Sequence, residues 1–212
     1  MQIKGLLFIV SAPSGAGKTS LTKAVLERLN ASTPRHLHWS CSYTTRDPRP
    51  EEVHGRDYFF ISEAEFDQMI EKGEFAEWAL VYGNKYGTSL HYLEDAEREG
   101  IDLLLEIDIQ GARQLHERYG RGIFIFILPP SAGALRKRLV KRGTEESFTI
   151  EERLRHARTE VDEWRFFEYI IINDKFEKAV AALEGIVMAE RSRRDRMNEQ
   201  VEEILKDFQK EG

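Results

Sequence analysis

Four short apolar runs divide this chain into regular pieces. They cover residues 6–10, 103–108, 123–128 and 168–172, and the second run (LLLEID) ends in carboxylates. Continuous apolar runs of this length predict strands that are buried on both faces, as in parallel sheets. Because helical patterns lie between the runs, we expect an α/β fold built on a doubly wound parallel sheet.

The pattern changes between the first and second runs. Residues 38–42 alternate like a short strand, and Ser62 with Glu65 forms a capping box that predicts the start of a helix. Gly83-Asn84 then separates two segments of strand character, which is the signal of a two-residue hairpin turn. We therefore expect a small, mostly antiparallel α+β unit, residues 38–88, inserted after the first strand and helix.

The C-terminal part of the chain predicts further helices. One covers residues 131–141, and another runs from a capping box at Thr149 and Glu152 to about Trp164. Between residues 135 and 158 eight Lys or Arg outnumber four Glu. From Phe176 we expect one helix almost to the end. Its apolar side chains would pack on the core or on a second subunit: Val201, Ile204, Leu205 and Phe208.

Composition narrows the class of protein. At 212 residues the chain can bury a sizeable core as one domain with insertions or as two small ones. A net charge of −6 argues against a general nucleic-acid binder, and no apolar run approaches the ~20 residues of a membrane helix. The single cysteine, Cys41, rules out an internal disulfide and suits a reducing compartment. We expect a cytoplasmic enzyme without nucleic-acid or membrane partners.

The loop after the first apolar run carries the most specific chemistry. Residues 11–19 read SAPSGAGKT and lead directly into a helical pattern, which is the layout of a phosphate-binding P-loop. Gly15 and Gly17 let backbone N–H groups turn toward one anion, Lys18 reaches the terminal phosphates, and Thr19 holds Mg²⁺. Ala12 stands where the motif has glycine, and it is tolerated there if its φ is negative.

Two segments that carry arginines indicate that a second phosphorylated substrate binds beside the P-loop. Pro48 and Pro50 bracket Arg49, so that Arg46 and Arg49 lie in a stiff, extended loop. The chain has no guanine-reading motif of the DxxG or NKxD type at a strand end, which argues against a switch GTPase. An insertion with arginines and a basic helical pair match the plan of a nucleoside monophosphate kinase, with an acceptor unit and a lid.

Five segments then resemble the guanylate kinase family of bacterial type, in order and nearly from end to end. They are SAPSGAGKTSL, SYTTRDPRPEEVHGRDYFF, EFAEWALVYGNKYGTS, LLLEIDIQGA and KRLVKRGT. The resemblance implies transfer of the γ-phosphoryl group of ATP to GMP, giving ADP and GDP, with dGMP left open as a second acceptor. Mg²⁺ is the implied cofactor, and the protein is expected to be a monomer or a homo-oligomer.

The resemblance also implies a domain plan. One guanylate-kinase-like domain would span about residues 4–190. Residues 1–37, 89–134 and 165–212 would form a three-layer P-loop core, residues 38–88 the GMP-binding insertion and residues 135–164 a helical lid.

Individual residues take their roles from the same resemblance. The GMP phosphate would be held by Arg46, Arg49, Tyr58 and Tyr86, and the guanine would be surrounded by Ser42, Glu77, Thr88 and Glu106. ATP would bind Ala12, Pro13, Ser14, Gly15, Ala16, Gly17, Lys18 and Thr19, with Asn173 and Asp174 near the adenine. The catalytic cations would be Lys18, Arg46 and the lid arginines Arg138, Arg142 and Arg153.

The chemistry of these side chains is consistent with that assignment. Guanine presents N1–H and N2–H₂ as adjacent donors, which one carboxylate such as Glu77 accepts together. Asp108 faces the same side of its strand as Glu106, and it would contact GMP, organise water on Mg²⁺, or serve as an ordinary helix cap. Because a GMP phosphate oxygen is already an anionic nucleophile, catalysis needs positioning and charge neutralisation and no general base.

Two alternatives remain open at this point. Some guanylate-kinase-like domains bind proteins and have lost catalysis, but Lys18 and Thr19 are intact here. A related P-loop kinase could act on another phosphorylated acceptor, although Ser42, Glu77 and Thr88 match a guanine site. Closure of both inserted units over the substrates is expected, since it would exclude water as a competing acceptor.

Overall fold

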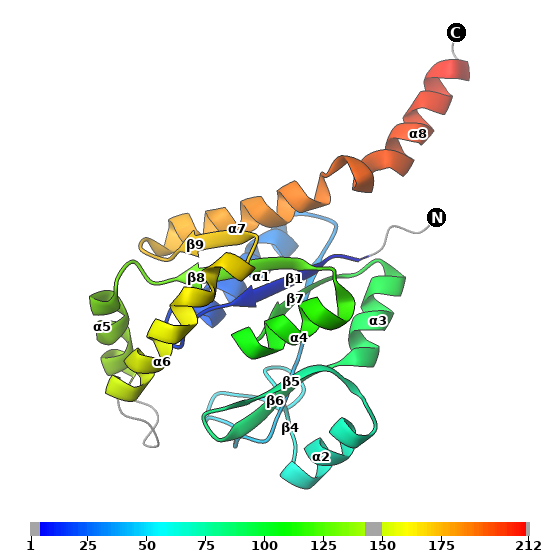
Figure 1. Ribbon diagram of the computed structural model, residues 1–212. Coiled ribbons are helices and arrows are strands. Elements are labelled where there is room, and N and C mark those ends of the chain that lie inside the picture. The colour runs from blue at the N-terminus through cyan, green and yellow to red at the C-terminus, as the bar shows by residue number, and fades with distance from the viewer. Residues whose placement is uncertain (1–4, 143–149, 211–212) are drawn as a thin grey trace.

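A parallel sheet with β1 (Leu7–Ser11) at its centre organises the molecule. The structure, a computed structural model, describes residues 5–142 and 150–210. β7 (Asp102–Glu106) and β8 (Ile123–Leu128) flank β1, while β2 (Leu37–Trp39) and β9 (Tyr169–Ile172) form the edges, giving the order β2-β7-β1-β8-β9. All four predicted apolar runs are therefore strands of this sheet, and the α/β fold is confirmed (Figure 1).

Helices cover both faces of the sheet. α1 (Lys18–Ser32) and α7 (Phe176–Arg191) pack on one face, and α3 (Leu90–Glu99) and α4 (Ile109–Tyr119) on the other. Successive side chains of β1 alternate between these layers, with Phe8 in the first core and Ile9 in the second. A strand buried on both faces must be apolar throughout, which is why its run is continuous.

A second, smaller sheet forms the inserted unit. It has the order β4-β3-β6-β5, with β3 (Tyr43–Thr44), β4 (Phe59–Phe60), β5 (Phe75–Val81) and β6 (Asn84–Ser89). Only the β3–β4 pair is parallel, so the unit is mostly antiparallel, as expected. α2 (Glu63–Glu71) begins at the predicted capping box of Ser62 and Glu65.

The inserted unit starts slightly later than the sequence indicated. We placed residues 38–42 within it, but β2 pairs with β7 and so belongs to the main sheet. Leu37 is fully buried there, which fixes this short strand at the edge of the core. The inserted unit therefore begins after Trp39.

The hairpin turn of this unit is shifted by one residue from the prediction. Val81 pairs with Asn84, so the turn residues are Tyr82 and Gly83 and not Gly83 and Asn84. Both have positive φ, 51° and 82°. A two-residue turn with two positive φ values matches the twist of the strands, and the ladder continues through Asn84.

The described part of the segment predicted to be a lid, residues 135–164, lies within α5 (Ala132–Arg142), α6 (Ile150–Asp162) and a short 3₁₀ helix (Glu163–Phe166). Leu135, Leu139, Leu154 and Ala157 form a small core between the two α-helices. The predicted cap residue Thr149 lies outside the described residues. The helix predicted up to Trp164 is thus α6 followed by one tighter turn.

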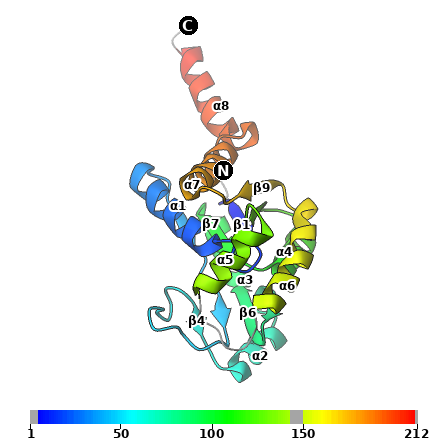
Figure 2. The same ribbon diagram turned by 90° about the vertical axis from the view of Figure 1, so that its left-hand side faces the viewer.

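The expected single C-terminal helix is wrong. α7 ends at Arg191 and α8 (Arg194–Lys210) follows. At the break, the Ser192 N–H donates to the Ala189 carbonyl, and its hydroxyl donates to the Met188 carbonyl. α8 projects away from the body in both views (Figures 1 and 2). The four apolar positions noted in the sequence are 47–72% exposed, so they do not pack on the core.

Within the described ranges, we find no helix with the length and apolar character needed to cross a membrane.

Candidate active site

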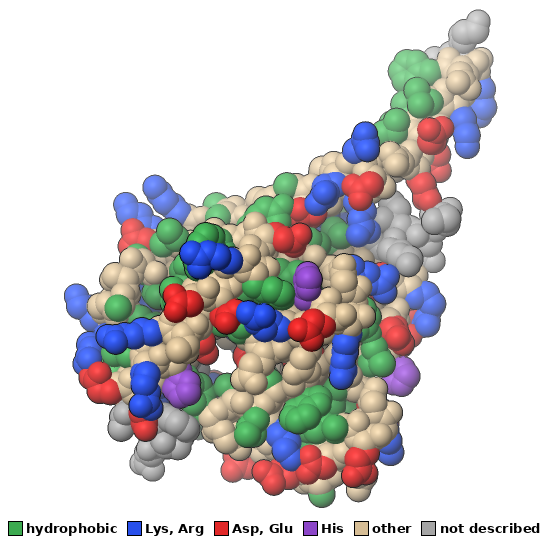
Figure 3. Space-filling model, in the orientation of Figure 1, with side chains coloured by type: hydrophobic (Ala, Val, Ile, Leu, Met, Phe, Trp, Pro, Cys, Tyr) green, Lys and Arg blue, Asp and Glu red, His purple; other side chains and the backbone are tan. Residues whose placement is uncertain are grey.

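A large cleft lies at the carboxyl ends of the core strands, where the core, the inserted unit and the lid meet. Its volume is about 1170 Å³, and Figure 3 shows the molecule hollowed between the inserted unit and the core. Parallel α/β sheets bind ligands at this end of their strands. Most of the predicted site residues line it: Ala12, Pro13, Ser14, Gly15, Gly17, Lys18, Thr19, Ser42, Arg46, Arg49, Tyr58, Glu77, Tyr86, Glu106, Asp108 and Arg138.

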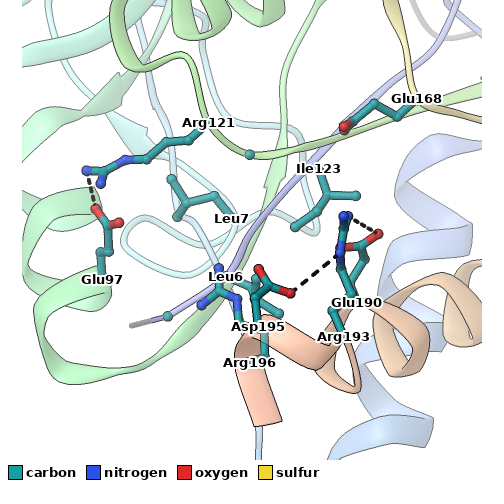
Figure 4. Close-up of a pocket in the computed structure, with 12 residues that line it drawn as sticks. Leu6, Leu7, Glu97, Arg121, Ile123, Glu168, Glu190, Arg193, Asp195 and Arg196 are labelled. Atoms are coloured by element: carbon teal, nitrogen blue, oxygen red, sulfur yellow. Dashed lines mark hydrogen bonds and ion pairs between the residues drawn. The ribbon is translucent and has the colours of Figure 1, made fainter. Parts of the chain in front are cut away.

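A smaller cavity of about 170 Å³ lies at the opposite, amino end of β1 and β8 (Figure 4). Its charged side chains already pair with one another, Arg121 with Glu97 and Arg193 with Glu190. None of the predicted site residues borders this cavity. We therefore take the larger cleft as the candidate active site.

The phosphate loop has the backbone that the motif requires. Gly15 and Gly17 have φ of 85° and 96°, and Gly17 is the N-cap of α1. Ala12 has no positive φ, so the condition for its tolerance is met. Ala16 is buried, and its carbonyl accepts from Asn173 Nδ2 at 2.8 Å and Arg138 Nη1 at 3.0 Å. The side chains of Asn173 and Arg138 therefore fix the position of the phosphate loop through hydrogen bonds to its backbone.

Lys18 and Thr19 connect the loop to the neighbouring strand β7. Lys18 Nζ donates to the Ile107 carbonyl at 2.7 Å, and the Thr19 hydroxyl donates to Glu106 Oε2 at 2.9 Å. Thr22 donates to the other oxygen of Glu106. Burial raises the pKa of Glu106, while Lys18 and the two threonines oppose this effect. Glu106 thus lies directly beside the predicted metal-binding hydroxyl.

Asp108 performs the capping role that the sequence left open. It is the N-cap of α4, and its carboxylate accepts from the Gly111 N–H at 3.0 Å. It also lines the cleft, so capping does not remove it from the site. Of the two carboxylates, Glu106 is the one that touches Thr19.

A cluster of cations and phenols forms one side of the inserted unit. Arg46 Nε donates to the Tyr86 hydroxyl at 3.3 Å, and its guanidinium lies 5.5 Å from the Tyr58 ring centroid. Glu52 accepts from Arg46 at 3.0 Å and pairs with Arg49 at 3.4 Å. Such a planar, preoriented guanidinium with adjacent hydroxyls suits a phosphate group.

Glu77 lies buried deeper in the same unit. It is 3% exposed, and Thr88, its cross-strand neighbour, donates to Oε1 at 2.5 Å. Burial raises the pKa of Glu77 to about 7, with Asp108 adding to this and Thr88 and Lys18 opposing it. Ser42 is also buried beside the cleft. A buried carboxylate needs hydrogen-bond donors, so it can select a ligand that presents two adjacent N–H groups.

Some assigned residues are not brought to the cleft. Asn173 is buried under the phosphate loop and Asp174 is exposed outside the cleft, so their proximity to an adenine stays a prediction. Arg153 is buried in α6 with its guanidinium 5.8 Å from the Tyr82 ring centroid. The side chain of Arg142 lies outside the described residues.

Among the residues that sequence reasoning missed, Glu160 and Gly111 bear most directly on the chemistry of the site. Glu160 on α6 lines the cleft near Ser14, although nothing in the local sequence distinguishes it from other helix charges. Gly111 lies so close to Glu77 that an added Cβ would be 2.2 Å from Oε2. Its only signal was its place inside the LLLEIDIQGA segment.

Comparison with known proteins gives a consistent result. The family model described as guanylate kinase matches residues 4–190. The chain is 53% identical to the guanylate kinase of Geobacter metallireducens, covering 96% of this chain and 98% of that protein. It is 44% identical to the one from Thermotoga maritima, covering 94% of each. The crystal structure of guanylate kinase from Anaplasma phagocytophilum superposes with a TM-score of 0.73 at 30% identity, covering 92% of this chain and 91% of that one.

Proposed function

Because this chain belongs to the guanylate kinase family, we propose that it transfers the γ-phosphoryl group of ATP to GMP, giving ADP and GDP. The observation that carries the assignment is a single cleft with a phosphate loop on the core side and a buried carboxylate, Glu77, on the inserted unit. The two halves match a phosphorylated donor and a guanine-bearing acceptor.

On the donor side, the loop from Ala12 to Thr19 would bind the phosphates of ATP. Backbone N–H groups and Lys18 neutralise the phosphate charge there. Mg²⁺ fits the oxygen donors of Thr19 and Glu106, which would hold it together with water and phosphate oxygens. The described residues contain no cluster of three or more acidic, His or Cys ligands, as suits an ion that keeps several waters. Bound there, it would neutralise charge on the transferred phosphoryl group.

On the acceptor side, Arg46, Arg49, Tyr58 and Tyr86 would hold the GMP phosphate. The guanine N1–H and N2–H₂ donors would pair with Glu77, with Ser42 and Thr88 beside it. Adenine has no such adjacent donor pair and would leave the buried carboxylate unsatisfied. A loss of this kind costs several kcal/mol, enough for strong discrimination.

The chain then acts by orientation and charge. The GMP phosphate is the nucleophile, so Arg46 and Lys18 align the two anions and oppose their repulsion. Arg138 approaches from α5, and Arg142 and Arg153 complete the proposed set of lid cations. Cytoplasmic location is part of the same proposal and suits the single cysteine, Cys41.

A coupled assay for ADP formation with GMP, dGMP, AMP and UMP as acceptors tests the proposal. We expect rapid turnover with GMP and at least a hundredfold lower kcat/KM with AMP, which corresponds to about 3 kcal/mol of discrimination. Comparable turnover with AMP would contradict the guanine assignment. No turnover with any acceptor would favour a protein-binding module.

Two variants separate the halves of the site. Glu77→Gln should raise KM for GMP far more than KM for ATP. Lys18→Ala should lower kcat while GMP affinity, measured by calorimetry, is largely kept. The opposite pattern in either variant would contradict the assignment of donor and acceptor sides.

A further inference from the structure

The turn of the β5–β6 hairpin holds an aromatic residue in an unfavourable backbone conformation. Tyr82 has φ 51°, and it is the only non-glycine residue with positive φ in the described part of the chain. Such a turn favours Asn, Asp or Gly, and a bulky side chain there is strained. A strained backbone conformation of this kind persists where contacts of the side chain with its surroundings stabilise it.

The Tyr82 side chain contacts the lid. Its ring centroid is 5.8 Å from the guanidinium carbon of Arg153 and 5.8 Å from the ring centroid of His156, which meets it edge-on at 78°. Arg153 and His156 lie three residues apart and so on one face of α6. A residue at the tip of the inserted unit is therefore packed against the helix that covers the other side of the cleft.

The same hairpin carries the acceptor contacts. Glu77 lies on β5 and Tyr86 on β6, and the strands are paired without interruption from Glu77 to the turn. A paired hairpin of this length moves as one body. Any shift of the hairpin when an acceptor binds is therefore passed to Tyr82 and to the lid.

We propose that Tyr82 is a positioning residue that links the inserted unit to the lid and sets the position of Arg153 for phosphoryl transfer. The inference rests on the function proposed above and concerns how the two substrate halves communicate. The ring contacts the guanidinium of Arg153 through a cation–π interaction. Tyr82 itself touches neither reacting phosphate.

Tyr82→Asn separates this role from a structural one. Asparagine is better suited than tyrosine to positive φ, so the melting temperature should stay the same or rise. Loss of the ring removes the cation–π contact to Arg153. We expect kcat to fall about tenfold with KM for ATP changed less than about twofold, since one cation–π contact corresponds to about one factor of ten. Tyr82→Phe keeps the ring and should restore kcat.

Hydrogen exchange provides a readout that does not depend on activity. In the ligand-free protein, α6 amides should exchange faster in Tyr82→Asn than in wild type or Tyr82→Phe, because the contact of Tyr82 with Arg153 and His156 is gone. The proposal would be overturned if Tyr82→Asn kept wild-type kcat or left the exchange of α6 unchanged. It would also be overturned if the melting temperature fell together with the activity, because the loss would then reflect reduced stability. If wild-type protein fails to phosphorylate GMP, the proposed function fails, while the α6 exchange still tests the link itself.

Discussion

Glu77 is the residue at which burial and binding chemistry oppose each other most directly. Burial raises its pKa to about 7, so the protonated form competes with the ionised form near neutral pH. Recognition of the guanine N–H donors requires the ionised carboxylate. The site is therefore expected to respond to pH in a range where most carboxylates are fully charged.

We predict that GMP affinity falls as pH decreases below about 7, because protonated Glu77 cannot accept both guanine donors. Calorimetry at pH 6 in two buffers with different ionisation enthalpies should detect proton release on GMP binding. Glu77→Gln should bind weakly and release fewer protons than the wild type, the remaining release coming from the GMP phosphate, whose second pKa is about 6. Equal GMP affinity at pH 6 and pH 8 in the wild type would contradict the prediction.

The ligand-free protein should show the opposite trend. Since the folded state raises the pKa of Glu77 above its ordinary value, the folded state binds the proton more tightly than the unfolded state. This group therefore favours the folded state fully below its ordinary pKa of 4.5, and that contribution is lost as pH rises from there to about 7.

Gly111 should be required for the position of Glu77. An added Cβ would lie 2.2 Å from Glu77 Oε2, so Gly111→Ala should displace the carboxylate and raise KM for GMP at least tenfold, with ATP affinity kept. Gly185→Ala is the matched control, because this helical glycine has open space around its Cβ position and its replacement should stabilise the fold slightly. Equal effects of the two variants on GMP use would contradict the prediction.

Glu160 places a negative charge beside an anion site. It is half-buried in the cleft, its Oε2 makes no hydrogen bond within the described residues, and burial raises its pKa while the Ser14 N–H opposes that change. The Glu160 carboxylate repels a phosphate group that binds at the loop, unless the Glu160 side chain moves away. Glu160→Gln should therefore bind inorganic tripolyphosphate more tightly, by about a factor of ten.

Glu151→Gln is the control for this charge change. Glu151 lies on the same helix, is exposed and pairs with Arg136. Calorimetry should show its tripolyphosphate affinity close to wild type. If both variants tighten binding equally, the effect is one of net charge and not of position.

At the scale of elements, local sequence signals determined most of the fold. The strand over residues 123–128 and the capping box at Ser62 are placed where their patterns predicted. The hairpin turn was misplaced because Gly83-Asn84 is the stronger local signal, whereas pairing of Asn84 with Val81 decides the register. The break after Arg191 has no Gly or Pro to mark it, so sequence alone could not locate it.

α8 should contribute little to the stability of the fold. None of its described residues is buried, and Phe208 is 72% exposed. A chain ending at Arg193 should therefore melt within about 2 °C of the full chain. Leu183→Ala in α7, where the side chain is fully buried, should lower the midpoint by about 5 °C or more. A large loss on removing α8 would mean that its apolar side chains are covered in solution.

At the scale of the whole molecule, the candidate site was predictable wherever a motif carried it. The phosphate loop and the arginines of the inserted unit were located from sequence because each lies within one continuous segment. Glu160 could not be located, because its nearness to Ser14 depends on how the lid approaches the core across 146 residues of chain. Long-range approach of this kind leaves no local pattern.

Closure should be visible in solution. With the cleft of about 1170 Å³ between three bodies, GMP together with a non-hydrolysable ATP analogue should reduce the radius of gyration measured by small-angle X-ray scattering. Glu77→Gln at the same GMP concentration should compact less. No compaction of the wild type with both ligands would contradict the prediction.

The carbonyl of Ala16 has a consequence for how the protein is made. One of its two donors, Asn173, follows 157 residues later, and β1 needs β8 as well as β7 for its neighbours. At about 5–20 residues per second, a nascent chain spends roughly eight to thirty seconds before Asn173 can support its phosphate loop. Until β8 has been made, its central strand β1 also has an open edge. Chaperones would therefore meet this protein at its first strand, and nucleotide could support the loop only once β9 has left the ribosome.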